Sequence, residues 1–291
     1  MRKQIAVLTN PTSGKGRGGR IGDVVLPRLR DAGFEVRALQ GRDADEALDL
    51  ARQTVADEIE TLVVIGGDGM VHLAVQALAG SGTRLGVVPA GTGNDVARTL
   101  GLPRKDAPAA TDVVIGGNER TIDLARIGAK YYVTVLAAGF DAVVNERANA
   151  MTWPKGRMRY NLATVAELRT FSPIPYVIEV DGEQHRFEAM MVAVGNGPSF
   201  GGGMRITEGA QIDDGVLDVI TIDPMSRTQL VRTFPKLFSG SHITHPKVHR
   251  YLGRRITVAA PGIVAYADGE RMAPLPLTVE VAPRALRVLV P

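Results

Sequence analysis

Two short apolar runs, each ending in a glycine-rich polar segment, constrain the fold of this chain more than any other feature. Residues 62–69 read LVVIGGDG and residues 85–95 read LGVVPAGTGND, and helix-compatible runs follow at 70–79 and 94–100. A buried strand, a glycine loop and a helix in succession, occurring twice, predict a parallel sheet whose loops meet at one edge. Backbone N–H groups and helix N-termini at that edge favour phosphate, so a nucleotide is the expected ligand.

Composition indicates a globular protein without membrane-spanning segments. Hydrophobic residues make up 45% and charged residues 22% of the 291 residues, and no apolar run approaches the roughly 20 residues that cross a bilayer. The chain lacks cysteine, which excludes disulfides and thiolate metal ligands, and it begins without an apolar signal segment. We therefore expect a cytoplasmic protein, and the length predicts two domains.

The pattern of strands and helices changes near residue 125. Up to residue 124, strands at 5–9, 34–39, 61–65 and 85–89 alternate with helices, including 20–32 and 43–56, which predicts a doubly wound α/β domain. Residues 125–291 instead predict an antiparallel β-sandwich domain, in which Asp181-Gly182 and Asp268-Gly269 indicate hairpin turns. Its expected strands are 131–137, 176–180, 187–194, 216–222, 255–259 and 277–281, with helices near 161–171 and 226–237. The final run, 285–290, fits a strand of either domain.

Polar residues in three segments are placed to face one crevice. Asp68 lies between glycines at a strand end, where its carboxylate can reach a hydrated Mg²⁺ or cap a helix. In the second loop Thr92 offers a hydroxyl to phosphate, and Asn94 or Asp95 is expected to cap the following helix. The segment Asn10-Pro-Thr-Ser-Gly14 follows the first strand and can face the same crevice.

The glycines that follow this segment match a dinucleotide motif only formally. Residues 14–19 read GKGRGG, but the dinucleotide fingerprint requires its first glycine directly after the strand. The P-loop pattern is absent, which disfavours a P-loop NTPase. Lys15, Arg17 and Arg20 are expected to neutralise phosphates or lipid headgroups, or to form a solvated basic loop.

Taken together, the motifs resemble those of the soluble bacterial diacylglycerol kinase and lipid kinase family, within the wider group of NAD kinase-like and phosphofructokinase-like proteins. The resemblance rests on the motifs at 10–14, 66–69, 89–95 with Ala97-Arg98, 201–215 and Asp268-Gly-Glu270, which occur in the family's order and span nearly the whole chain. It implies an ATP site between an α/β domain and a β-sandwich domain, with phosphoryl transfer to a lipid hydroxyl.

The resemblance also implies residue roles. Asp268 would accept the proton of the acceptor hydroxyl, with Glu270 as its neighbour or as the competing base. A structural Mg²⁺ would be held by Asp214 and by backbone carbonyls near Gln211 and Val216, and Asp68 would reach that ion through water. Both Asp-Gly pairs also suit plain turns. The expected nucleotide-binding residues are Asn10, Pro11, Thr12, Ser13, Gly14, Gly66, Gly67, Asp68, Gly69, Thr92, Asn94 and Asp95.

Two positions depart from the family pattern. Met70 follows the first glycine loop where the family commonly has threonine, so a phosphate or cap contact there must come from the backbone. Residues 39–42 read LQGR where the family often supplies a threonine near the nucleotide, which leaves base and ribose contacts open.

Two further clusters admit more than one interpretation. His242, His245 and His249 are close in sequence, but no carboxylate lies among them, so a solvated or anion-binding basic face is favoured over a zinc site. Residues 153–160 read WPKGRMRY, a mixture that suits a membrane interface, a protein interface or an ordinary loop. No motif for nucleic-acid recognition accompanies these charges, so nucleic acid is not an expected partner.

The preferred hypothesis is an ATP- and Mg²⁺-dependent lipid kinase that converts diacylglycerol into phosphatidate while bound transiently to the anionic inner face of the membrane. An NAD kinase-like or sphingoid-type kinase is the enzymatic alternative. A nucleotide-binding, membrane-docking module without turnover is the non-enzymatic one, and Met70 is its best support. A dinucleotide oxidoreductase would use the glycines of residues 14–19, but no matching catalytic set is present. Whether the protein forms a homodimer is left open.

Overall fold

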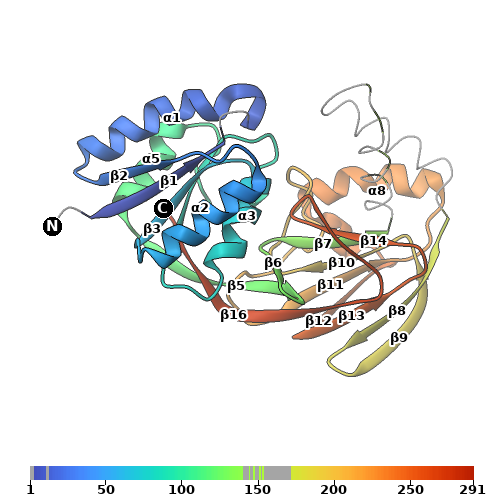
Figure 1. The fold of residues 1–291 in the computed structure, drawn as a ribbon. Helices are drawn as coiled ribbons and strands as arrows, with labels where there is room; N and C mark the ends of the chain where they lie inside the picture. Colours follow the sequence, from blue (N-terminus) through green and yellow to red (C-terminus); the bar gives the residue numbers. More distant parts are fainter. Residues whose placement is uncertain are drawn as a thin grey trace.

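The first half of the protein is a parallel sheet between two layers of helices (Figure 1). The structure, a computed structural model, describes residues 3–10, 13–139, 144, 147, 151, 153 and 172–291. In the order β2-β1-β3-β4, the parallel strands are β1 (Gln4–Thr9), β2 (Glu35–Leu39), β3 (Thr61–Gly66) and β4 (Arg84–Pro89). Helices α1 (Ser13–Asp31) and α5 (Ala107–Gly116) pack on one face, and α2 (Ala44–Ala56) and α3 (Asp68–Leu78) on the other. The short α4 (Asp95–Thr99) follows the second glycine loop.

Local sequence explains most of these elements, with one exception at α1. All six residues of β3 are buried, as expected for a central parallel strand, and Asp43 caps α2 by accepting a hydrogen bond from Glu46 N. Helix α1 begins at Ser13, so the predicted start at residue 20 is wrong and the glycines of residues 14–19 lie in its first turns. Glycine disfavours helix, but burial of Val25 and Leu29 in the core fixes this one.

The second half is a sandwich of two sheets, which confirms the predicted fold class. One layer contains β5 (Glu119–Ile127), β6 (Lys130–Tyr132), β8 (Ile174–Val180), β9 (Glu183–Ala189), β13 (Arg255–Ala259) and β16 (Leu277–Leu289). The other contains β7 (Val135–Gly139), β10 (Met191–Gly195), β11 (Leu217–Ile222), β12 (Val248–Gly253), β14 (Val264–Ala267) and β15 (Glu270–Pro274). Ile178 and Val258 of the first layer share one core with Val192 and Val219 of the second.

The last strand joins the two halves into one ten-stranded sheet. The first part of β16 pairs with β13 and β5, and further on Val288 pairs in parallel with Leu85 of β4. A bulge between Ala282 and Leu286 separates the two parts, and Arg284 N within it donates to Asp123 Oδ1 at 2.6 Å. The final run of the sequence therefore belongs to a single strand that contacts both halves.

Two runs predicted as single strands, 131–137 and 187–194, are each divided between the two sheets. The first becomes β6 and β7, and the second becomes β9 and β10. Met190 lies at the second crossing, where its N–H donates to Ile222 O at 2.7 Å. The single-strand prediction was wrong because an apolar run reads the same whether it stays in one sheet or passes into the facing one.

Helices outside the α/β half are few in the described residues. The predicted helix near 226–237 is α8 (Arg227–Ser239), followed by the 3₁₀ turn η1 (Ser241–Thr244). The helix predicted near 161–171 lies outside the described residues. Within the part of the chain that the structure describes, no helix combines the length and apolar character needed to cross a membrane.

The junction made by β16 should carry much of the stability. Leu286 is 1% exposed and packs in the core that contains Leu62 and Leu85 of the α/β half, whereas Leu252 on β12 is 56% exposed. We expect Leu286→Ala to lower the free energy of unfolding by about 2–4 kcal/mol, because it leaves a cavity in the core against which β16 packs. The matched change Leu252→Ala should alter it by less than about 0.5 kcal/mol. Urea denaturation of both variants measures the difference, and equal effects would contradict the structural role of β16.

Candidate functional site

The two glycine loops touch each other through their backbones. A Cβ atom on Gly91 would lie 2.6 Å from the Cα atom of Gly67, so no larger residue fits there. Ala90 N also donates to Gly66 O at 2.8 Å, which extends the pairing of β3 and β4 into the loops. The loops thus form one surface at the carboxyl ends of the strands, and Thr92 is exposed on it.

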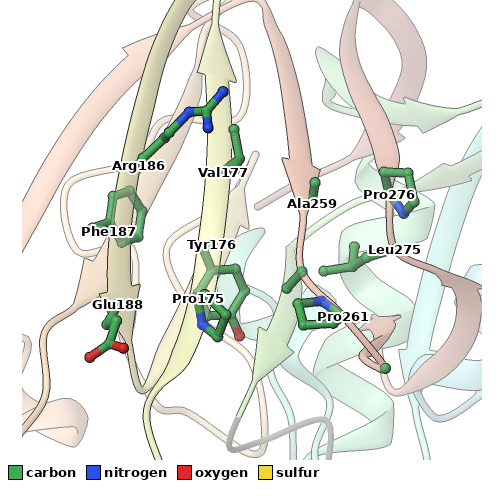
Figure 2. A pocket seen from close by; sticks show the side chains of 12 residues that line it. Pro175, Tyr176, Val177, Arg186, Phe187, Glu188, Ala259, Pro261, Leu275 and Pro276 are labelled. Atoms are coloured by element: carbon green, nitrogen blue, oxygen red, sulfur yellow. The ribbon is translucent and has the colours of Figure 1, made fainter.

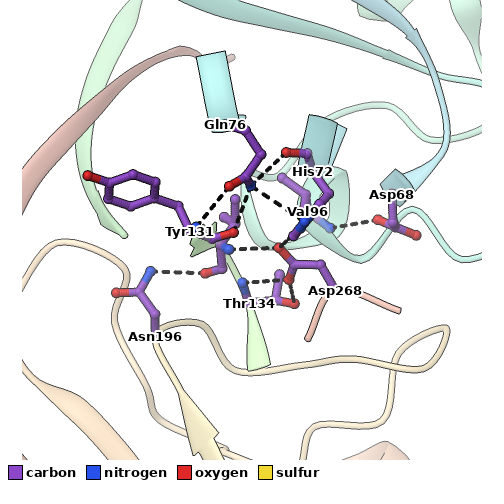
Figure 3. Close-up of polar contacts among 9 residues, drawn as sticks. Asp68, His72, Gln76, Val96, Tyr131, Thr134, Asn196 and Asp268 are labelled. Atoms are coloured by element: carbon purple, nitrogen blue, oxygen red, sulfur yellow. Dashed lines mark hydrogen bonds and ion pairs between the residues drawn. The ribbon is translucent and has the colours of Figure 1, made fainter. Parts of the chain in front are cut away.

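Helix α4 is capped differently from the prediction. Asn94 has a left-handed backbone, with φ of 53°, and its side chain makes no cap bond. Its amide turns back instead, accepting from Gly91 N at 3.1 Å and donating to Gly91 O at 3.0 Å. Asp68 Oδ1 accepts from Val96 N at 3.2 Å, so a carboxylate from the first loop caps the helix of the second (Figure 3).

Asp68 and Asp95 bring two carboxylates together beside these loops. A Cβ on Gly93 would lie 2.8 Å from Asp68 Oδ2 and 3.5 Å from Asp95 Oδ2. Burial, and next the negative charge of Asp95, raise the pKa of Asp68 to about 6, and burial also raises the pKa of Asp95. Asp95 Oδ1 is buried without a hydrogen bond, although Arg98 Nε lies 3.5 Å away. This arrangement favours a proton or a cation at the pair.

Asp95 also ties the α/β half to the sandwich. Its Oδ2 accepts from Gly202 N at 2.6 Å, and Arg98 Nη2 donates to Gly202 O at 3.1 Å. Gly203 gives Arg98 room, because a Cβ there would lie 2.9 Å from the guanidinium carbon. The glycine-rich segment 201–203 therefore closes directly onto the second glycine loop.

The predicted hairpin at Asp268-Gly269 is confirmed. Ala267 pairs with Glu270 across the turn, and both turn residues have positive φ, 51° and 84°. The Asp268 carboxylate points inward: Oδ2 accepts from Val133 N at 2.8 Å, and Oδ1 accepts from Thr134 N at 2.9 Å and Thr134 Oγ1 at 2.5 Å (Figure 3). These bonds occupy the two amides at which β6 gives way to β7.

Glu270 differs from Asp268 in being exposed. Its Oε1 lies 3.0 Å from the position that a Cβ on Gly69 would take, so the carboxylate lies directly against the first glycine loop. Asp268 holds the turn, and Glu270 is the carboxylate of the predicted pair that a bound molecule can reach.

Sequence reasoning missed two residues of α3 that contact this region. His72 Nδ1 lies 3.7 Å from Asp268 Oδ2. One turn later, Gln76 Nε2 donates to Tyr131 O at 2.8 Å and Gln76 Oε1 accepts from Tyr131 N at 2.9 Å (Figure 3). Polar residues spaced by four on an otherwise apolar helix, directly after a glycine loop, are the signal that could have identified them.

Met70 is a core residue in this structure. It is 8% exposed, and a Cβ on Gly66 would lie 2.6 Å from its Cβ. Its N–H donates to Gly67 O at 3.0 Å. The methionine therefore fills space under the loop that Gly66 leaves open.

The predicted metal loop is held against β5. Gly215 N donates to Asp123 Oδ2 at 2.7 Å, and Arg120 pairs with Asp213 at 2.7 Å. Gln211 and Asp214 are exposed, and Asp214 Oδ1 accepts from Val216 N at 3.0 Å. No cluster of three or more aspartate, glutamate, histidine or cysteine side chains that could hold a metal occurs among the described residues. A Mg²⁺ here would rest on one carboxylate and backbone carbonyls, and it stays a prediction.

The three histidines have separate partners. His242 is fully buried with Nε2 at 2.9 Å from Ile206 O, and burial lowers its pKa. His249 Nε2 lies 2.8 Å from Asp223 Oδ2, and His245 Nδ1 accepts from Lys247 N at 3.2 Å. The disfavoured zinc interpretation gains no support from this arrangement.

Two hollows border the molecule away from Asp268. One, of about 340 Å³, lies beside Pro89 and is lined by Arg17, Arg20 and Lys105, for which the described residues supply no ion-pair partner. It suits an anionic group near the end of β4. The other, of about 770 Å³, is a groove at the ends of β8, β9 and β13 (Figure 2), and it shares no residue with the glycine loops.

The predicted nucleotide-binding segment 10–14 and the predicted membrane-interface segment 153–160 lie partly outside the described residues. Asn10 directly follows β1, where its N–H donates to Ile65 O at 3.4 Å, and Ser13 and Gly14 begin α1. Pro11 and Thr12 lie outside the described residues, as do 154–160 of the predicted membrane-interface segment. Trp153 of that segment is 78% exposed.

The carboxylate pair yields a pH-dependent prediction. With its pKa raised from 3.8 to about 6 on folding, ionised Asp68 opposes folding at pH values above both. At pH 7.5, Asp68→Asn should raise the free energy of unfolding by about 1–2 kcal/mol. One pKa unit corresponds to about 1.4 kcal/mol, and the expected gain is smaller than the full shift would give because Asp68 is partly exposed to solvent. The gain should shrink toward pH 4.5, where the folded protein already holds the proton.

Chemical denaturation in EDTA at pH 7.5 and pH 4.5 measures the free energy of unfolding of the wild type and of Asp68→Asn. Asp31→Asn is the control, because it removes an exposed carboxylate. A gain of equal size at both pH values would contradict the raised pKa.

Each half of the chain is similar to a known protein domain. Residues 4–127 match the diacylglycerol kinase catalytic domain, and residues 134–290 match the YegS C-terminal NAD kinase beta sandwich-like domain. A diacylglycerol kinase of Mycobacterium tuberculosis is 42% identical over 294 residues, which cover 99% of this chain and 95% of the relative. One from Bacillus subtilis is 28% identical, covering 88% and 86%.

Solved structures show the same fold. A diacylglycerol kinase from Bacillus anthracis superposes with a TM-score of 0.76 at 20% identity, covering 99% of this chain and 97% of that one. An NAD kinase from Archaeoglobus fulgidus in complex with ATP gives 0.54 at 14% identity, covering 98% and 93%. On the strength of the matched domains and the near full-length likeness to the mycobacterial protein, the chain belongs to the diacylglycerol kinase family and is a kinase-type phosphotransferase.

Proposed function

We propose that this protein transfers the γ-phosphate of ATP to the free hydroxyl of diacylglycerol, giving phosphatidate. The observation that carries the proposal is the position of Glu270, an exposed carboxylate held by the β14–β15 turn so that it faces Gly69 of the first glycine loop. A base from the sandwich placed beside a phosphate-binding surface of the α/β half is the arrangement that phosphoryl transfer to a hydroxyl needs.

The glycine loops supply the phosphate side of the reaction. The backbone around Gly66, Gly67, Gly69 and Gly91 can approach phosphate oxygens closely, and α3 directs its N-terminus toward the same edge. Thr92 offers an exposed hydroxyl, and the basic hollow lined by Arg17, Arg20 and Lys105 supplies positive charge beside β4. Their role is to hold ATP and to spread the negative charge of its phosphates.

Glu270 is the better candidate for the general base than Asp268. The Asp268 carboxylate is buried and accepts three hydrogen bonds, so its oxygens are already engaged. Glu270 can accept the proton of the acceptor hydroxyl as that oxygen bonds to the γ-phosphorus and the bond from phosphorus to the departing ADP oxygen breaks. Asp268 then acts as a positioning residue, since its bonds fix the turn that carries Glu270.

A divalent cation fits the pair formed by Asp68 and Asp95. Their carboxylates lie close together, burial raises both pKa values, and Asp95 Oδ1 has no hydrogen bond. Oxygen ligands of this kind are those that Mg²⁺ prefers, and a bound Mg²⁺ would neutralise charge on the transferred phosphoryl group. The site predicted at Gln211, Asp214 and Val216 is a separate proposal, with a structural ion in the loop beside β5.

The direct test is transfer of labelled γ-phosphate from ATP. Diacylglycerol, a sphingoid base and NAD are offered in parallel in mixed micelles that contain anionic lipid, with and without EDTA. We expect label in phosphatidate, and loss of label in EDTA. Label in phosphorylated sphingoid base or in NADP would replace the acceptor, and no transfer to any acceptor would favour the nucleotide-binding module without turnover.

The base assignment has its own test. Glu270→Gln should lower kcat by about 10²–10⁴-fold, the usual contribution of a general base, without changing Tm, because the side chain is exposed. Glu35→Gln, an exposed glutamate on β2, is the matched control and should keep full activity. A Glu270→Gln enzyme with wild-type kcat would remove Glu270 from the mechanism.

A further inference from the structure

Helix α8 exposes an apolar stripe that the rest of the described chain leaves uncovered. Val231, Phe234 and Phe238 are 59%, 38% and 48% exposed, and their spacing places them on one side of the helix. The two phenylalanine rings are in edge contact, with centroids 5.9 Å apart. We call these three residues the docking face.

The docking face is not the side by which α8 binds the sandwich. Leu230 and Leu237 pack against the core that includes Ile206 and Ile220. The helix is also well terminated, since Ser226 and Gln229 form a capping box and Gly240 adopts a left-handed conformation with φ of 75°. The docking face therefore belongs to a helix already ordered in the free protein, which keeps the entropic cost of binding low.

Charge on α8 selects the kind of partner. Residues 227–239 include three basic residues and no acidic one. Arg232 and Lys236 lie between the residues of the docking face in sequence, are exposed, and have no ion-pair partner in the described part of the chain. A twofold contact between copies would bring two such cationic helices together, which is unfavourable. Exposed aromatic residues flanked by basic ones suit an anionic lipid surface.

We propose that the docking face of α8 inserts into the headgroup region of an anionic membrane. This inference rests on the proposed function, since diacylglycerol lies in the membrane and the kinase must meet it at the membrane surface. It adds a docking element distinct from the segment 153–160 suggested by sequence.

Hydrogen bonds link α8 to the site. Leu237 O accepts from Arg205 N at 2.7 Å. Gly202, which lies three residues before Arg205, donates its N–H to Asp95 Oδ2. In Figure 1, α8 lies along the upper end of the sandwich, above β14, the strand that leads into the Asp268 turn. Docking through α8 would thus hold the β14–β15 turn at a fixed place relative to the bilayer.

The test uses the full-length double variant Phe234→Ser, Phe238→Ser. Sedimentation with vesicles of phosphatidylcholine and phosphatidylglycerol should show a partition coefficient reduced by about tenfold or more, because two aromatic side chains no longer enter the lipid. Leu252→Ser, which alters an apolar residue of similar exposure on β12, should bind as the wild type does. Arg232→Glu and Lys236→Glu should each weaken binding by about fivefold or more, and only with anionic vesicles.

Turnover, Tm and oligomeric state distinguish membrane docking from a packing or dimerisation role of the docking face. Turnover of a short-chain diacylglycerol dispersed in solution should be unchanged in the double variant, while turnover of long-chain diacylglycerol in vesicles falls. If no diacylglycerol is phosphorylated but vesicle binding still depends on the two phenylalanines, the proposed function fails and the docking proposal stands. Unchanged vesicle binding, a lowered Tm showing that the face packs within the chain, or conversion of a dimer to a monomer would each overturn the docking proposal.

Discussion

The site depends on how a buried carboxylate is satisfied. Asp268 is 6% exposed, and a charge in such a place is tolerated only when hydrogen bonds replace its water. Val133 N, Thr134 N and Thr134 Oγ1 supply those bonds. Because both amides point to Asp268, the strand breaks there, and β6 and β7 continue in different sheets. The same bonds fix the turn that directs Glu270 to the first glycine loop.

Other contacts complete the assembly across the two halves of the molecule. Asp95 and Arg98 bind the backbone of Gly202, and Gln76 pairs with the backbone of Tyr131. Each contact uses a polar group that would be costly to bury alone, so the halves are stabilised in one relative position. The proposed base comes from one half and the proposed phosphate-binding surface from the other, which makes the chemistry dependent on this arrangement.

Local sequence predicts much of the fold and of the candidate site. Strands that end in glycine loops, the Asp-Gly hairpin and the change of pattern near residue 125 all predict their elements, because turn chemistry and hydrophobic periodicity act over a few residues. The hydrogen bonds that Asp268 accepts from Val133 N and Thr134 N could not be predicted, since these donors lie 135 and 134 residues away in the sequence. The sheet crossings at Thr134 and Met190, the inward turn of Asn94 and the contact of His72 with Asp268 are likewise set by tertiary packing.

A double-mutant cycle between Asp268→Asn and Thr134→Val, in which the free energy of unfolding is measured for each variant, tests directly whether Asp268 organises the site. If the Asp268 carboxylate holds the turn through Thr134, removal of either group should weaken the other's contribution. We expect a coupling of about 1–3 kcal/mol, as for a buried hydrogen bond to a charged group. Additive effects, with a coupling below about 0.5 kcal/mol, would contradict it.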